Sequence, residues 1–127
     1  MFAKVVLWIV GLITLAFGAW TLALPFGIAG LVGYDLMTPG AITEIRAFYG
    51  GVELGLALFW ISGAFKPSLL RPALVSMVMI WGAVAASRTL GIVLDGSLSQ
   101  TMIVVLITEI ASAVLALIAL TRLKPTD

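Results

Sequence analysis

The sequence predicts an all-α integral membrane protein, an up-down-up-down four-helix bundle whose two termini are both cytoplasmic. The first reason is composition, since 62% of the 127 residues are hydrophobic and only 10% are charged. Soluble domains are about 45–50% apolar and about 25% charged, so this chain is not an ordinary water-soluble domain. The second reason is that four apolar stretches each have roughly the 20 residues that a helix needs to cross a bilayer. We therefore expect one membrane domain over residues 1–127.

The four stretches lack the short alternation of polar and apolar residues that is typical of membrane β-strands. To within a few residues, the predicted spans are 5–24, 42–65, 72–94 and 101–120. The outer connection, 25–41, is apolar and rich in glycine. This favours a segment that lies in the membrane interface, and the alternative is a lid over a pocket. Residues 1–20 also resemble a secretory signal peptide, but their apolar run is longer than is typical of one.

The charges of the connections predict which side of the membrane each connection faces. Basic residues on short loops mark the cytoplasmic side. The first and third connections carry only acids, Asp35 and Asp95. An even number of spans also places both termini on the same side. Both arguments agree, because the basic residues lie before the first span, in the second connection or after the fourth span: Lys4, Lys66, Arg71, Arg122 and Lys124.

The composition also excludes several kinds of chemistry. The chain contains no cysteine and no histidine, so it cannot form a disulfide framework, a thiolate nucleophile, an imidazole base or a histidine-ligated metal site. A net charge of +1 gives no support for nucleic-acid binding. We expect no cofactor, no metal and no nucleic-acid partner.

The charges within the spans are informative, because an unpaired charge at the bilayer centre costs about 2.5–3.5 kcal/mol. Arg46 and Glu53 are seven residues apart, close to two turns of α-helix, and should share one face. Arg88 and Asp95 have the same spacing on the next span. These two spans run in opposite directions. We therefore expect Arg46 beside Asp95 near the outer surface, and Glu53 beside Arg88 about 10 Å deeper.

Glu109 of the fourth span is expected at the depth of Glu53 and Arg88, which gives this layer one arginine and two glutamates. A surplus acid there needs a proton, a cation or water to compensate it. The interpretations left open are a ligand, ion or proton site and a buried polar clamp that only fixes helix register. Tyr49, three residues after Arg46, reaches the same outer face. The candidate site residues are Arg46, Tyr49, Glu53, Arg88, Asp95 and Glu109; none is assigned a catalytic role.

The first span carries no charge but places small and polar side chains on one face. Small residues allow close approach between membrane helices, so this face is expected to pack inward; its residues are Gly11, Thr14, Gly18 and Thr21. Trp20 and Trp60 lie close enough to predicted span ends for an aromatic belt.

The stretch from Glu44 to Gly55, E-I-R-A-F-Y-G-G-V-E-L-G, resembles the E-I-R-A-x-Y-G-G-x-x-L-G motif of an uncharacterised bacterial family of small four-span integral membrane proteins, known as a domain of unknown function. The residues from Arg88 to Gly91, followed by Asp95, resemble the second signature of that family. The similarity in length and layout covers essentially the whole chain. The resemblance implies the bacterial inner (cytoplasmic) membrane and no particular activity. It also implies a shared core that contains Arg46, Tyr49, Gly50, Gly51, Glu53, Arg88 and Asp95.

We expect a non-catalytic membrane protein that binds a lipid or small ligand, or an accessory subunit, because the chain has no usual nucleophile–base pair. The first alternative is a proton-coupled transporter or channel that uses Glu53, Arg88 and Glu109. The least favoured is a membrane enzyme acting on a lipid, with Glu53 and Glu109 as an acid–base pair. The expected partners are the lipid bilayer and a homodimer or larger membrane complex, with Gly51 and Gly55 as a small-residue contact.

Overall fold

A computed structural model describes residues 1–123, and Lys124, one of the cations used to predict the cytoplasmic side, lies outside the described residues. This part of the chain contains helices and no strand, as predicted. Four helical segments are long and apolar enough to cross a membrane. In chain order the elements are α1 (Phe2–Ala23), α2 (Pro25–Val32), α3 (Pro39–Ile45), the π-helix η1 (Arg46–Val52), α4 (Glu53–Phe65), α5 (Pro67–Asp95) and α6 (Gln100–Thr121).

The helix ends follow local chemistry. Prolines occupy the first turns of α2, α3 and α5, where the missing backbone N–H would have no helical partner. Thr38 and Ser99 cap α3 and α6, each accepting a hydrogen bond from the backbone N–H three residues later. Gly33 and Gly96 end α2 and α5 with φ of 78° and 63°, a left-handed conformation that side chains disfavour.

The structure adds detail to the predicted connections. The outer connection 25–41 contains α2 in its first half, and α3 begins at Pro39. The third apolar helix starts at Pro67, a few residues before the predicted start at residue 72. Pro72 lies inside that helix. A proline inside a helix removes one backbone hydrogen bond and crowds the carbonyl group four residues before it, and α5 nevertheless continues through Pro72 to Asp95.

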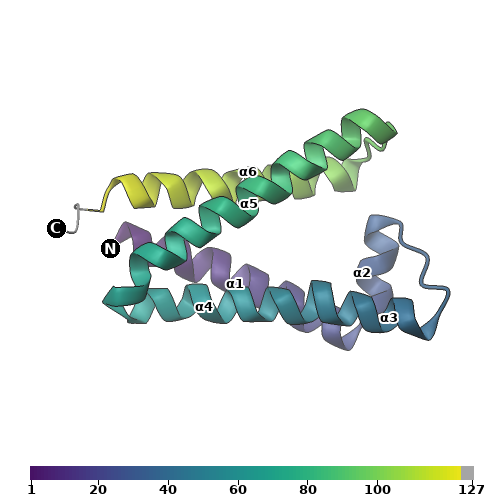
Figure 1. The fold of residues 1–127 in the computed structure, drawn as a ribbon, viewed down its shortest axis with the longest axis horizontal. Helices are drawn as coiled ribbons and strands as arrows, with labels where there is room; N and C mark the ends of the chain where they lie inside the picture. Colours follow the sequence, from purple (N-terminus) through teal and green to yellow (C-terminus); the bar gives the residue numbers. More distant parts are fainter. Residues whose placement is uncertain (124–127) are drawn as a thin grey trace.

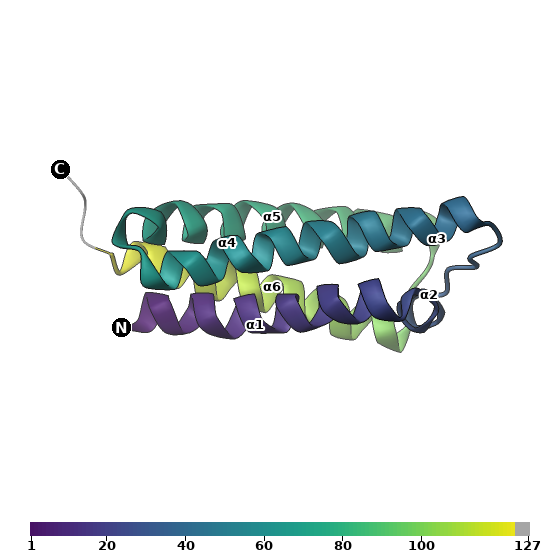
Figure 2. The same ribbon diagram turned by 90° about the horizontal axis from the view of Figure 1, so that it is seen from below.

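The long helices form two pairs. Figure 2 shows them running roughly along one direction, with α1 and α5 opposite in sense to α4 and α6. The most extensive packing is between α1 and α4 and between α5 and α6, and α4 also packs on α5. In Figure 1 the α5/α6 pair diverges from the α1/α4 pair toward the end that carries α2 and α3. We call the half that holds the start of α1 and the end of α6 the closed half, and the other the open half.

The hydrophobic core occupies the closed half. Leu7, Trp60, Leu74 and Met77 are fully buried there among small residues of all four long helices. Trp60 was expected in an interfacial belt, and this was wrong: it is fully buried, and its indole N–H donates to Ser76 Oγ at 3.0 Å. This hydrogen-bond partner for the indole N–H allows the large ring of Trp60 to be buried. The position of Trp60 along its helix does not predict that burial.

The inward face predicted for the first span is confirmed, since all four of its small and polar residues are buried. A Cβ atom placed on Gly18 would lie 3.0 Å from both Gly50 O and Leu54 N, and 3.2 Å from Glu53 Cβ. The backbones of α1 and of the η1–α4 junction therefore approach each other as closely as glycine permits. This crossing fixes Glu53 beside α1 in the open half.

Candidate functional site

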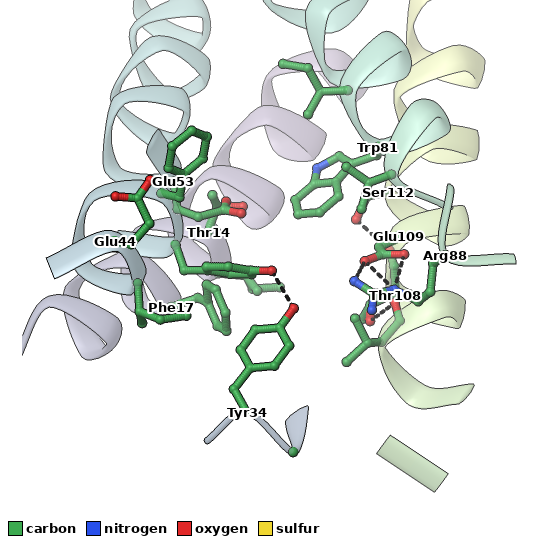
Figure 3. A pocket seen from close by; sticks show the side chains of 18 of the residues that line it. Thr14, Phe17, Tyr34, Glu44, Glu53, Trp81, Arg88, Thr108, Glu109 and Ser112 are labelled. Atoms are coloured by element: carbon green, nitrogen blue, oxygen red, sulfur yellow. Dashed lines mark hydrogen bonds and ion pairs between the residues drawn. The ribbon is translucent and has the colours of Figure 1, made fainter. Parts of the chain in front are cut away.

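A cavity of about 900 Å³ lies between the two helix pairs in the open half. All four long helical segments contribute to it, together with residues 33–36 of the outer connection. Most of the lining is apolar, as illustrated by Ile13, Phe17 and Val84. The polar groups of the cavity lie on two opposite walls (Figure 3), with Glu53 and Glu44 on the α1/α4 side and Arg88 and Glu109 on the α5/α6 side.

Arg88 of α5 and Glu109 of α6 form an ion pair at the cavity wall. Arg88 Nη2 lies 2.6 Å from Glu109 Oε1, and Arg88 Nε lies 2.9 Å from both carboxylate oxygens. Glu109 is 3% exposed and Arg88 is 25% exposed. The fork-like contact of a guanidinium with a carboxylate gives both strength and fixed orientation. Arg88 was expected to pair with Glu53, and that expectation was wrong.

Glu53 instead lines the cavity without a partner. Its Oε2 atom is buried and has no hydrogen-bond partner, and the same holds for the indole Nε1 of Trp81. Both residues line the cavity, and Trp81 also packs against Trp60 with ring centroids 5.9 Å apart. A buried polar atom without a partner costs free energy. Both atoms are closed off from solvent, so each could meet a ligand in the cavity only after its side chain turns.

The expected pairing of Arg46 with Asp95 was also wrong. Arg46 is exposed and its Nε donates to the backbone oxygen of Leu22 at 3.1 Å, while Asp95 is exposed at the end of α5. Neither residue lines the cavity. The physical reason is η1, which occupies the whole interval from Arg46 to the residue before Glu53. A π-helix closes its hydrogen bonds over five residues instead of four, so a spacing of seven no longer returns to the same face.

Tyr49 reaches the cavity and meets a residue that the sequence analysis did not select. Its hydroxyl lies 2.8 Å from the hydroxyl of Tyr34, and the two rings stand edge to face with centroids 6.0 Å apart. Tyr34 belongs to the connection between α2 and α3, and Figure 3 shows it reaching toward the cavity, with a dashed line from its hydroxyl that marks this hydrogen bond. The structure thus joins the outer connection to η1. The lid interpretation of this connection gains support, because residues 33–36 line the cavity.

The cavity residues missed from the sequence are Tyr34, Asp35, Glu44 and Trp81. Glu44 and Asp35 could have been found, since both are acids near the outer end of the predicted bundle. Trp81 could not, because nothing in its local sequence distinguishes a packed tryptophan from one with an unpaired N–H at a cavity wall. Within the described chain, no group of three or more acidic residues is arranged to hold a metal ion.

Comparison with known proteins gives a family without an assigned activity. The model of a family described as Domain of unknown function (DUF4345) matches residues 2–120. This agrees with the kind of family expected from the motif around Glu44–Gly55; the bacterial origin and the motif itself stay predictions. No curated protein and no solved structure gives a significant match to the chain.

Proposed function

We propose that this chain, which belongs to the DUF4345 family of domains of unknown function, binds an apolar small molecule or lipid in the cavity between its two helix pairs. The observation that carries the proposal is this mostly apolar cavity, whose walls include two side chains with a polar atom that has no hydrogen-bond partner, Glu53 Oε2 and Trp81 Nε1. A ligand with a polar group that pairs with either atom offsets the cost of burying it. Mostly apolar walls with a few polar groups are typical of small-molecule sites.

The size of the cavity supports the same proposal. Sites for drug-sized ligands measure about 300–1,000 Å³, and this cavity has about 900 Å³. The closed half is packed, with Leu7, Leu74 and Met77 fully buried. Binding is therefore assigned to the open half, with the closed half as its rigid base.

We also propose that the protein is a multi-pass protein of the bacterial inner membrane, with both termini cytoplasmic. Large apolar side chains are exposed along the outward helix faces, including Val93 at 74% and Met79 at 68%. Soluble monomers rarely expose such patches. The basic residues Lys4, Lys66 and Arg122 lie at helix ends of the closed half. Because cytoplasmic loops are enriched in basic residues, we assign the closed half to the cytoplasmic side.

The test is calorimetric binding of 1-octanol to the protein in maltoside micelles, with empty micelles subtracted. Val84 lines the cavity and Val75, on the same helix, is exposed and does not. Val84→Phe fills part of the cavity and should weaken octanol binding by about tenfold or more. Val75→Phe adds the same group elsewhere and should leave binding unchanged. Equal binding by wild type and both variants would remove the cavity as the site.

The second candidate is proton-coupled transport, which is favoured by the presence of Glu53, Arg88 and Glu109 on one cavity. Membrane proton pathways use buried acids of this kind. A homodimer fits this candidate, because a Cβ atom on Gly55 would meet nothing within 4 Å and one on Gly51 only Arg46 O. Proton flux into liposomes separates the two functions. Transport is excluded if Glu53→Gln and Glu109→Gln both leave the wild-type flux unchanged.

A further inference from the structure

We propose that the ligand of this cavity is an organic ammonium ion with an apolar body. The inference rests on the proposed function, because it names the chemical class that the same cavity takes. It follows from three independent features of the lining: the balance of charge, the aromatic side chains and the position of the unpaired carboxyl group.

The charge of the lining is unbalanced. Arg88 is the one cation among the lining residues, and it forms the bidentate ion pair with Glu109 described above. The same cavity is also lined by three acids, Asp35, Glu44 and Glu53. No further cation among the lining residues is available to pair with them. Like charges repel an anionic ligand, whereas a cationic one gains from each of these acids. The cavity therefore favours a positively charged occupant.

A metal ion fits this lining less well than an organic cation. Calcium needs about six to eight oxygen ligands, and the described residues include no group of three acids placed to hold a metal. The walls around the acids are mainly apolar, with Ile13, Val84 and Val105 among them. Apolar walls stabilise the carbon body of an organic cation and do nothing for a hydrated metal ion.

The aromatic side chains support an ammonium group in particular. Ring faces attract a cation, and aromatic cages are a recurring way to hold alkylated ammonium ions. Five aromatic residues from four separate parts of the fold line this one cavity: Phe17, Tyr34, Phe48, Tyr49 and Trp81. Aliphatic walls would stabilise a neutral apolar ligand as well as aromatic walls do. The rings and acids together therefore select a lipophilic ammonium ion.

Glu53 is the group placed to hold the ammonium head. Its side chain lines the cavity, its Oε2 has no hydrogen-bond partner and is closed off from solvent, and its backbone is fixed where α1 crosses the η1–α4 junction at Gly18. After a rotation of the carboxyl group, an ammonium N–H donating to it would form a charge-assisted hydrogen bond, which is about twice as strong as a neutral one. Glu44 and Asp35 add charge at exposed positions of the lining, where solvent screens them more.

The experiment compares three ligands that share one chain and differ in the head group: n-octylamine, 1-octanol and octanoate. Each is titrated at pH 7 into the protein in uncharged maltoside micelles, with empty micelles as the blank. We expect octylamine to bind about tenfold or more tightly than octanol, and octanoate to bind most weakly. This comparison uses the wild-type protein alone, so it does not depend on the folding of any variant.

Two variants then locate the head group. Glu53→Gln keeps the size of the side chain and should reduce octylamine affinity by about tenfold while changing octanol affinity by less than about threefold. Asp95→Asn makes the same chemical change at an exposed position that does not line the cavity, and should alter neither. An amine preference that survives intact in Glu53→Gln would overturn the role of Glu53.

The outcomes separate this inference from the proposed function. If octanol or octanoate binds as tightly as octylamine, the ammonium inference fails and ligand binding in the cavity stands. If none of the three binds, both fail. A lipid head group and a free amine share the ammonium chemistry, so phosphatidylethanolamine and phosphatidylglycerol are added as competitors. Competition by phosphatidylethanolamine alone identifies a lipid as the source, and competition by neither lipid identifies a free amine.

Discussion

At the scale of single residues, the position of one arginine decides which acids are available to a ligand. Arg88 holds Glu109, which is almost completely buried, through three nitrogen–oxygen contacts of 2.6–2.9 Å. Glu53 lines the cavity, and one of its carboxyl oxygens has no hydrogen-bond partner. In the proposed function, the ion pair serves structure and the unpaired acid binds the ligand. The polar clamp and the ligand site, which the sequence presents as alternatives, would then be two parts of one layer.

The ion pair makes a stability prediction. Arg88→Leu leaves the Glu109 carboxylate buried without its partner, which should lower the free energy of unfolding by about 3 kcal/mol. Thermal unfolding in detergent measures the loss. The double variant Arg88→Leu/Glu109→Leu removes both charges and should recover most of it, because a buried ion pair is often replaced by apolar residues at little cost. A double variant no more stable than Arg88→Leu would contradict this account.

The sequence located the right polar layer and paired its members incorrectly. Arg88, Glu53 and Glu109 all line one cavity, as their predicted depths require. Which acid Arg88 takes depends on the packing of α5 against α6, and sequence spacing does not contain that information. Arg46 was misplaced for a different reason, because seven residues return to one face only in an α-helix and the intervening segment is π-helical.

At the scale of helices, the close crossing of α1 over the η1–α4 junction positions Glu53. Gly18 and Gly50 permit it, and a Cβ on Gly50 would lie 2.8 Å from Leu22 side-chain atoms. π-helical segments are frequent at functional sites, and this one carries Tyr49 and leads directly into Glu53. The inward orientation of the small residues on the first span was predictable from their spacing. The π-helix was not, because nothing in the sequence of Arg46–Val52 distinguishes a π-helix from an α-helix.

Gly18→Ala tests this crossing. The added methyl group would lie 3.0 Å from two backbone atoms of the junction, and overpacking of this kind costs about 1–3 kcal/mol. Gly82→Ala is the matched control, since a Cβ there meets nothing within 4 Å, and alanine is the better helix former. We expect lower thermal stability for Gly18→Ala and unchanged or higher stability for Gly82→Ala. Equal stability of the two variants would exclude the close crossing.

The contact between the outer connection and η1 leads to a prediction about the rate of ligand dissociation. The hydrogen bond between Tyr34 and Tyr49 ties this connection to η1, and a neutral hydrogen bond contributes about 0.5–1.5 kcal/mol. Tyr34→Phe should therefore accelerate octanol dissociation by about two- to tenfold, as measured by stopped-flow fluorescence. Tyr49→Phe should have the same effect, and the double variant should add nothing further. Additive effects would show that the two hydroxyls act separately.

At the scale of the whole molecule, the two helix pairs divide the protein into a packed half and a hollow half. The pairs meet around Leu7, Trp60 and Met77 and diverge beyond this core (Figure 1), where α2 reaches across to contact α6. The number and type of the long helices followed from hydropathy alone. Their divergence did not, because it depends on which helices pack most closely, and that is settled by side-chain fit across the bundle.

The proposed orientation predicts which ends of the helices face each side of the membrane. The chain has no cysteine, so a single introduced thiol reports one position. Ser68 lies at the closed end and Ser97 in the connection after α5, and both are exposed. In intact cells, an impermeant maleimide should label Ser97→Cys and leave Ser68→Cys unlabelled until the cells are opened. The reverse pattern would place the termini outside.

The most direct measurement of ligand binding in the open half is the ¹⁵N-indole NMR spectrum of the protein in micelles, titrated with n-octylamine. Trp81 lines the cavity and its indole N–H is buried without a partner, whereas Trp20 is 44% exposed and outside the lining. We expect a saturable shift of the Trp81 resonance while that of Trp20 stays in place. A Trp81 resonance that does not move, or that moves together with Trp20 and without saturation, would contradict it.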